Sequence, residues 1–177
     1  KRTNQGSNKV TITDVQILDG DANVTNNYDI KKTPGTITIN KASIEDGDAF
    51  KVSNIGNEVY DGQEHVKEPT VTTADGAKTL KKDTDYTVTY KEGQNFVNVG
   101  TIEVTITGTG NYSGTVTRSY QITKRPVEIA VASATFTYDG NEKSVDYTVS
   151  EKGEDTGLVE SHSEKVTLDG NKRTNQG

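Results

Sequence analysis

The chain lacks cysteine, methionine and tryptophan altogether. Without cysteine it can form no disulfide framework, no thiolate metal site and no thiol nucleophile. Histidine is nearly absent as well, because only His65 and His162 occur, and two imidazoles far apart in the sequence are too few for a histidine-rich zinc site. Both histidines stand in polar loop sequence, where we expect solvated side chains.

Apolar residues and positive charge are also scarce. Hydrophobic residues make up 29% of the 177 residues. No apolar run approaches the roughly 18–20 residues that cross a bilayer, so we expect no membrane span. The formal net charge of −6 argues against nucleic acid as a partner, because phosphate backbones attract basic surfaces. The polar excess is mostly threonine, glycine and asparagine, and threonine favours strands with one wet face.

The same hexapeptide, Lys-Arg-Thr-Asn-Gln-Gly, stands at positions 1–6 and at positions 172–177. Six identical residues in order are too many for a chance match. The offset of 171 residues predicts a tandem array with that period, of which the chain holds one period and a short overlap. An artificial duplication of the hexapeptide is the alternative interpretation.

A weaker repeat lies inside the chain. The sequence Val-Tyr-Asp-Gly-Gln-Glu at 59–64 has a counterpart in Thr-Tyr-Asp-Gly-Asn-Glu at 137–142. The pair Asn-Tyr at 111–112 precedes an alternating segment, and so does the pair Asn-Tyr at 27–28. A Tyr-Asp-Gly start and an Asn-Tyr finish therefore occur twice.

The order of these motifs predicts the domain boundaries. In the middle of the chain the start precedes the finish, which predicts a complete β domain at 43–125. In the other copy the finish comes first, so we predict that 1–42 is the C-terminal half of a split β domain and that 126–177 is its N-terminal half. Such halves have open strand edges, which pair within a chain or between chains.

Alternation of apolar and polar residues predicts half-buried strands. The clearest cases are residues 86–90 and 101–107, and turn signals such as the Asp-Gly pair at 61–62 separate the strands. No stretch shows a convincing helical periodicity. We therefore predict an all-β fold of tandem small antiparallel domains. A two-sheet immunoglobulin-like sandwich fits the strand number and turn spacing, and a β-grasp domain with little helix is the alternative.

Large side chains at strand centres are expected to carry the small core, because each is worth about 1.5–3 kcal/mol when fully buried. The residues predicted to form the core or the turns are Tyr28, Ile37, Ile39, Tyr60, Asp61, Gly62, Tyr86, Tyr90, Ile102, Val104, Ile106, Tyr112, Tyr120, Ile122, Tyr138, Asp139 and Gly140.

Several motifs together resemble a known family. In the middle of the chain they are Val-Tyr-Asp-Gly at 59–62, Asp-Tyr-Thr-Val-Thr-Tyr at 85–90, Asn-Val-Gly-Thr at 98–101 and the glycine-rich segment at 106–115. In the other copy they are at 138–140, 157–160, 24–28 and 34–39. These motifs resemble the bacterial Ig-like/MBG-type tandem repeats of Gram-positive surface adhesins. The resemblance implies a stalk or adhesin role, and it carries over no catalytic residue.

One turn has the spacing of a calcium ligand set. Asp19, Asp21 and Asn23 follow the alternate positions of a calcium-binding loop, but Val24 and Ile30 stand where such a loop has glycine and a bidentate glutamate. A hairpin turn with solvated carboxylates is therefore the favoured interpretation. Apart from this weak calcium candidate, we expect no cofactor, no catalytic residue and no enzymatic activity.

These observations favour a structural role outside the cell. We expect a repeat of an extracellular surface stalk, adhesin or filament, wall-anchored or secreted, with strand complementation completing the split domain. Its partners would be adjacent repeats of the same protein or neighbouring identical chains. The alternative is an adhesive module that binds a host glycan or protein.

Overall fold

The computed structural model describes residues 2–170 and 172–173. Strands account for 36% of the described residues and helical structure for 2%, which confirms the predicted all-β class. The strands are β1 (Gly6–Val10), β2 (Leu18–Asp19), β3 (Ala22–Asn23), β4 (Gly35–Ile39), β5 (Ala42–Ser43), β6 (Phe50–Val52), β7 (Glu58–Val59), β8 (Val71–Thr73), β9 (Tyr86–Tyr90), β10 (Gly100–Gly108), β11 (Tyr112–Ser113), β12 (Thr115–Thr123), β13 (Ile129–Val131), β14 (Lys143–Ser144), β15 (Tyr147–Val149) and β16 (Lys172–Arg173). A single 3-10 turn, η1 (Thr25–Asn27), is the helical element of the described residues. Within those residues, no helix has the length and apolar character needed to cross a bilayer.

The chain forms two compact units. Unit 1 comprises Lys1–Ser53, Pro69–Thr89 and Thr105–Thr117. Unit 2 comprises Asn54–Glu68, Tyr90–Val104 and Arg118–Gly177. Residues of β10 and β12 therefore belong to both units, and the division at 43–125 expected from the motif order stays a prediction.

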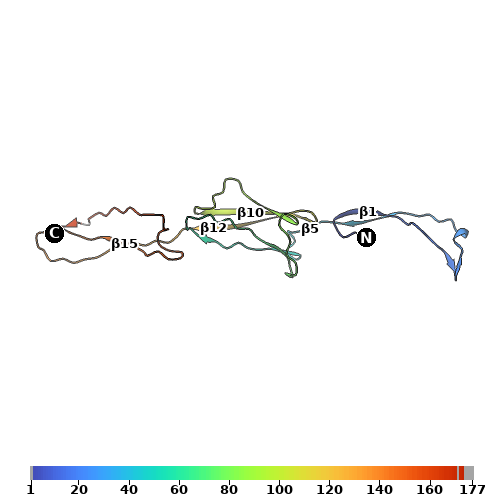
Figure 1. Ribbon diagram of the computed structural model, residues 1–177, viewed down its shortest axis with the longest axis horizontal. Helices are drawn as coiled ribbons and strands as arrows, with labels where there is room; N and C mark the ends of the chain where they lie inside the picture. Colours follow the sequence, from blue (N-terminus) through green and yellow to red (C-terminus); the bar gives the residue numbers. More distant parts are fainter. Residues whose placement is uncertain (1, 171, 174–177) are drawn as a thin grey trace. The chain divides into compact units, whose positions relative to one another are not determined.

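The largest sheet contains four strands in the order β7-β12-β10-β9, and its central strands β10 and β12 lie side by side (Figure 1). Successive side chains of a strand point to opposite faces. Accordingly Ile102, Val104 and Ile106 on β10 are at most 1% exposed, whereas the residues between them are half-buried. On β12, Tyr120 and Ile122 are each 1% exposed. The buried face of this sheet thus carries the alternating residues that predicted it.

A second group of buried residues lies in unit 1. Strands β6 and β8 pair antiparallel and place Val52 opposite Val71, and both side chains are buried. The ring of Phe50 meets the ring of Tyr112 edge to face, with 5.7 Å between centroids. Such aromatic pairs add to the stabilisation from apolar burial.

Two short strand pairs are parallel, although most pairs are antiparallel as predicted. β5 runs parallel to β11, and β7 runs parallel to β12. Only strands joined by a tight hairpin must be antiparallel, whereas partners far apart in the chain can take either direction. β7 and β12 are such distant partners, and alternation within each strand carries no information about direction.

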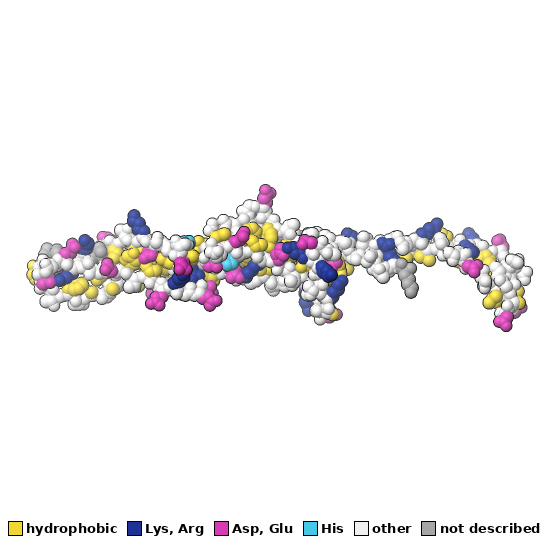
Figure 2. Space-filling view, in the orientation of Figure 1, with side chains coloured by type: hydrophobic (Ala, Val, Ile, Leu, Met, Phe, Trp, Pro, Cys, Tyr) yellow, Lys and Arg dark blue, Asp and Glu magenta, His cyan; other side chains and the backbone are white. Residues whose placement is uncertain are grey.

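The predicted half-domains contain only two-stranded sheets among the described residues. In the first, β1 pairs with β4 and β2 with β3; in the second, β13 pairs with β15 and β14 with β16. A two-stranded sheet without a second layer cannot bury an apolar face. Val10 is therefore 52% exposed, and Ile129 is 47% exposed. Figure 2 shows apolar side chains reaching the molecular surface.

Candidate interaction site

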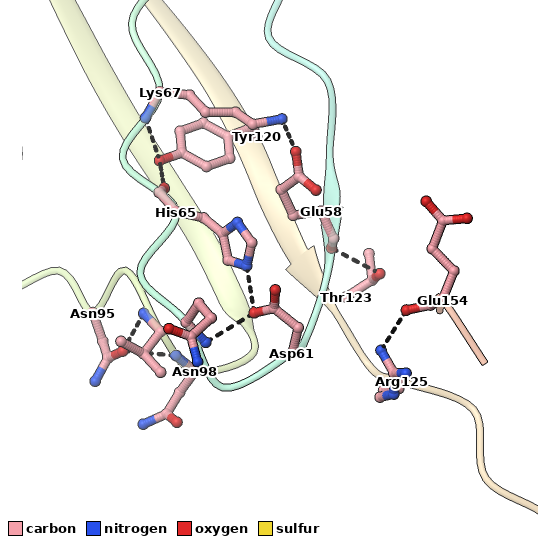
Figure 3. A network of polar contacts seen from close by, with 12 residues as sticks. Glu58, Asp61, His65, Lys67, Asn95, Asn98, Tyr120, Thr123, Arg125 and Glu154 are labelled. Carbon is pink, nitrogen blue, oxygen red and sulfur yellow. Dashed lines mark hydrogen bonds and ion pairs between the residues drawn. The ribbon is translucent and has the colours of Figure 1, made fainter. Parts of the chain in front are cut away.

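In the Tyr-Asp-Gly turn at 60–62, the carboxylate of Asp61 accepts hydrogen bonds from residues that follow it in the chain. The backbone N–H of Gln63 donates to Asp61 Oδ1 at 2.8 Å, and His65 Nε2 lies 2.8 Å from the same oxygen (Figure 3). Gly62 has a φ of 80°, a left-handed conformation that glycine adopts without strain. The pKa of Asp61 is lowered, chiefly because the Gln63 N–H stabilises the charged form and also through His65.

The imidazole of His65 is part of this turn and is not freely solvated. Its side chain is only 16% exposed, which corrects the expectation from the polar loop sequence. The physical reason is the Asp61 carboxylate, which gives the ring a hydrogen-bonding partner beside the sheet. The other histidine, His162, is exposed and stacks on the ring of Tyr60, with 5.8 Å between centroids.

Two tyrosine hydroxyls anchor the strand-free segment that follows the turn. The Tyr120 hydroxyl accepts from the Lys67 N–H at 3.2 Å and donates to the His65 carbonyl. The Tyr90 hydroxyl donates to the Lys67 carbonyl at 3.0 Å. Backbone groups away from a sheet need such partners, because leaving them unpaired and buried is costly. These side chains therefore replace the ladder that this segment lacks.

Burial shifts the ionisation of both tyrosines. Desolvation raises the pKa of Tyr90 to about 12. It also raises the pKa of Tyr120, against the opposing effect of the Lys67 N–H. The neutral phenols are thus the forms that the fold stabilises, and they act as hydrogen-bonding anchors.

The parallel pairing of β7 and β12 places the residues that precede the turn beside the end of β12. Its register places Glu58 opposite Ile122 and Val59 opposite Thr123. The Thr123 hydroxyl donates to the Glu58 carbonyl at 3.0 Å, and the N–H of Tyr60 donates to the Thr123 carbonyl at 2.9 Å. The Glu58 carboxylate also forms an ion pair with Lys67. The turn is therefore attached to the sheet by main-chain and side-chain contacts.

Beyond β12, the guanidinium of Arg125 is enclosed by backbone carbonyls of residues 153–157. Its Nε donates to Gly157 at 2.8 Å, Nη1 donates to Glu154 at 3.0 Å, and Nη2 donates to Gly153 at 2.6 Å and to Thr156 at 2.9 Å. The fixed fork of donors suits such a set of acceptors. The contact to Glu154 is drawn in Figure 3.

An open hollow of about 430 Å³ lies next to this arginine, within unit 2. Its lining includes Asp61, Arg125, Lys152 and Glu160. Lys152 Nζ lies 2.7 Å from Glu160 Oε2, and the Arg125 guanidinium donates to backbone carbonyls, so these two cations already have partners within the chain. The hollow thus offers hydroxyl, carboxylate and amide groups to a ligand.

The second Tyr-Asp-Gly turn reproduces the geometry of the first. The N–H of Asn141 donates to Asp139 Oδ1 at 3.0 Å, and Lys143 Nζ lies 2.6 Å from Asp139 Oδ2. Gly140 has the same φ of 80° as Gly62. Lys143 follows Asp139 by four residues, as His65 follows Asp61. The hydrogen bond from Lys143 is the main cause that lowers the pKa of Asp139 to about 2. The two turns are therefore structural counterparts.

The predicted core residues fall into two groups. Tyr86, Ile102, Val104, Ile106, Tyr120 and Ile122 are buried, and Ile39, Tyr60, Asp61, Gly62, Tyr90 and Tyr112 are half-buried. Tyr28 is 56% exposed, Ile37 42% and Tyr138 71%, and Asp139 and Gly140 are also exposed. Tyr28, Ile37 and Tyr138 are therefore not buried within the single chain, because no second layer covers them, and their place in a completed core stays a prediction.

The calcium candidates lie on a tight hairpin. Asp19 ends β2 and pairs with Ala22 of β3, and Asp21 occupies the turn between the two strands. The side-chain oxygen of Asn23 accepts from the Thr25 N–H at 3.0 Å. No group of three or more metal-ligating histidine or acidic side chains occurs among the residues that the structure describes.

Sequence reasoning missed the tyrosine anchors and the arginine clamp. Arg125 stands in a Lys-Arg-Pro sequence typical of a linker, but its four carbonyl partners come from residues 153–157, nearly thirty residues later. No local signal in the sequence points to these partners, because the fold brings residues 153–157 to the arginine. The chain matches no family model, no curated protein and no solved structure.

Proposed function

We propose that the chain is a structural repeat of a long extracellular bacterial surface stalk, adhesin or filament. One period of 171 residues would hold two β domains, and strand complementation would complete the split one. The observation that carries the proposal is the identity of residues 1–6 with residues 172–177. An array of this kind is stabilised mainly by contacts within each unit and with its neighbours.

The twin turns support the same proposal. Asp61 and Asp139 each hold the backbone of the second following residue and a basic or imidazole side chain four residues later. The same local structure thus occurs once beside a four-stranded sheet and once in a half-domain with exposed apolar residues. This is the pattern expected when a repeating unit is divided between two periods.

The length of tandem chains tests the proposal. Chains of one, two and three periods, each period joined at the shared hexapeptide, would be compared by small-angle scattering and electron microscopy. We expect the maximum dimension to grow by a constant step for each added period. Compact particles whose dimensions grow only with the cube root of mass would contradict a stalk.

Surface placement needs a separate measurement. Antibodies raised against the 177-residue chain would be applied to intact and to permeabilised cells that make the protein. We expect equal labelling of both. Labelling that requires permeabilisation would contradict the extracellular assignment.

The polar hollow favours a second candidate function, an adhesive module for a glycan or host protein. Its lining of Asp61, Arg125, Lys152 and Glu160 offers donors and acceptors of the kind that bind sugar hydroxyls. A glycan array probed with the chain, and with Lys152→Ala as the matched variant, tests it. Binding that is lost in the variant would support this function, whereas the absence of any bound glycan would count against it.

A further inference from the structure

We propose that the β1–β4 hairpin of one copy inserts into the C-terminal half of a second copy, between residues 136–137 and residues 164–168. The inserted hairpin would complete a four-stranded sheet with the strand order of the sheet β7-β12-β10-β9. This inference rests on the proposed repeat function and names the surfaces and the register by which consecutive periods join.

The first observation is that the hairpin copies the two central strands of the existing sheet. Residues 10–13 read Val-Thr-Ile-Thr, and so do residues 104–107 of β10. β1 begins at Gly6, four residues before this tetrapeptide, and β10 begins at Gly100, likewise four residues before it. β1 pairs antiparallel with β4, as β10 neighbours β12. β1 is therefore the counterpart of β10, and β4 the counterpart of β12.

The second observation is the difference in burial between counterparts. Val104 and Ile106 are 0% exposed, whereas Val10 is 52% and Ile12 is 48% exposed. Aligning the lysines that follow the strands, Lys124 and Lys41, matches Tyr120 with Ile37 and Ile122 with Ile39. Tyr120 is 1% exposed, but Ile37 is 42% exposed. The hairpin thus presents apolar residues at the positions that form the core of the complete sheet.

The edge of β4 has a matching partner in the second turn. β12 is flanked by β7, with Glu58 opposite Ile122 and Val59 opposite Thr123. Aligning the Tyr-Asp-Gly motifs at 60–62 and 138–140 makes residues 136–137 the counterparts of residues 58–59. The predicted parallel register is therefore Ile39 opposite Phe136 and Asn40 opposite Thr137.

This register would also cover exposed apolar side chains. Phe136 is 51% exposed and Tyr138 is 71% exposed. Tyr60, the counterpart of Tyr138, is half-buried, and its N–H donates to the carbonyl of Thr123 on β12. By the same register the Tyr138 N–H would donate to the Asn40 carbonyl of the other copy.

The edge of β1 has a partner of the same kind. β9 neighbours β10 in the complete sheet, and its Val88-Thr89 pair recurs as Val166-Thr167 at the same spacing from the two turns. Residues 164–168 belong to no strand in the structure. Pairing with β1 would make them a strand, so that both edges of the hairpin gain a partner.

A second copy of this chain is the occupant that these observations select. The hairpin and the acceptor residues 136–138 occur in one sequence, and both carry exposed apolar side chains. They are different surfaces, so the contact is head to tail and does not close on itself. In a tandem array it joins consecutive periods, and between separate chains it builds a filament.

Cysteine cross-linking tests the register directly, because the chain has no cysteine of its own. Full-length chains carrying Asn40→Cys would be mixed with chains carrying Thr137→Cys and oxidised mildly. Directly opposed strand residues lie within disulfide reach. We expect a cross-linked heterodimer in yield at least about tenfold above the control, because docking raises the effective concentration of the two thiols.

The matched control replaces Thr137→Cys by Thr148→Cys. Thr148 is exposed on β15, which pairs with β13, so the proposed register does not place it beside Asn40. Equal yields with both partners would overturn the proposal. The double variant Asn40→Cys/Thr137→Cys gives a further outcome: a ladder of oligomers supports insertion between copies, whereas an internally linked monomer would overturn it.

A second pair of variants tests the self-association of the chain without introducing cysteine. Ile37→Asp places a charge on the face that docks, whereas Thr38→Asp places it on the opposite face of the same strand. We expect sedimentation to show self-association of the wild type and of Thr38→Asp, and a loss of at least about tenfold in association for Ile37→Asp. Equal association of the two variants would contradict the docking face.

The two levels of proposal fail separately. Tandem chains that lengthen by a constant step, but whose thiols do not cross-link in the predicted register, would overturn the hairpin insertion and leave the repeat function standing. Tandem chains that stay compact would overturn the repeat function itself.

Discussion

The Nε2 atom of His65 lies 2.8 Å from Oδ1 of Asp61, four residues earlier in the chain. The same carboxylate oxygen accepts the N–H of Gln63, so one aspartate organises the whole turn. Asp139 makes the corresponding contacts to Asn141 and Lys143 in the second turn. The two turns therefore share one local structure, in which the aspartate is the common acceptor.

Replacing Lys143 should release the carboxylate of Asp139. The hydrogen bond from Lys143 is the main reason that the pKa of Asp139 is about 2, below its ordinary value of 3.8. In Lys143→Met the pKa should rise toward 3.8, as followed by NMR titration of the carboxyl carbon, while Asp61 keeps its midpoint. Because folding lowers this pKa, its stabilisation is present above about pH 4 and is lost as the pH falls toward 2. An unchanged Asp139 midpoint would contradict the ion pair.

Removing the Tyr120 hydroxyl should destabilise the segment after the first turn. Tyr120→Phe leaves the Lys67 N–H and the His65 carbonyl without their shared partner, which we expect to cost about 1–3 kcal/mol. Urea unfolding and faster amide exchange at Lys67 measure the effect. Tyr112→Phe is the control, because that hydroxyl accepts from the exposed Lys78 side chain and its loss should stay within about 0.5 kcal/mol. Equal effects would refute the anchoring role.

Tyr90 should ionise late in alkaline solution. Burial raises its pKa to about 12 from 10.0, and because folding raises it, the stabilisation is present below about pH 10 and is lost as the pH rises through 12. Tyrosinate absorbance should therefore show a late component that disappears in Tyr90→Phe. Identical titrations of the two proteins would exclude this assignment.

The twin Val-Thr-Ile-Thr segments should respond differently to the same truncation. Ile106→Ala empties a fully buried position and should cost about 2–5 kcal/mol. In dilute chain, Ile12→Ala changes a side chain that is 48% exposed and should shift stability by no more than about 0.5 kcal/mol. Thermal unfolding of both variants at low concentration compares them. A large loss in Ile12→Ala under these conditions would mean that Ile12 is already buried.

Loss of the arginine clamp should loosen residues 153–157. Arg125→Lys keeps the charge but cannot present a planar fork to four carbonyls. We expect a loss of about 1–3 kcal/mol and faster amide exchange at Gly157, whose N–H donates to the Pro126 carbonyl. Lys124→Ala, one residue earlier and exposed, is the control. Unchanged exchange at Gly157 in Arg125→Lys would show that the clamp is dispensable.

Local pattern was enough to predict the fold class, most of the longer strands and the turns. Alternation at 101–107 predicts both the strand β10 and its buried face, because side chains on successive strand residues point in opposite directions. The Asp-Gly pair at 61–62 likewise predicts a turn, since glycine alone takes a left-handed φ without strain. These properties depend on residues that are neighbours in sequence.

The remaining features depend on residues far apart in the chain. The parallel direction of β7 and β12, the half-burial of His65 and the carbonyl partners of Arg125 have no local signature, because each partner is chosen by tertiary packing. The exposure of Ile37 has the same origin. Ile37 stands in an alternating segment that predicts a core strand, as Tyr120 does in β12. The sequence alone determined that Ile37 and Tyr120 are large side chains on strands. Only the tertiary structure decided which are covered, because burial requires a second layer and a two-stranded sheet has none.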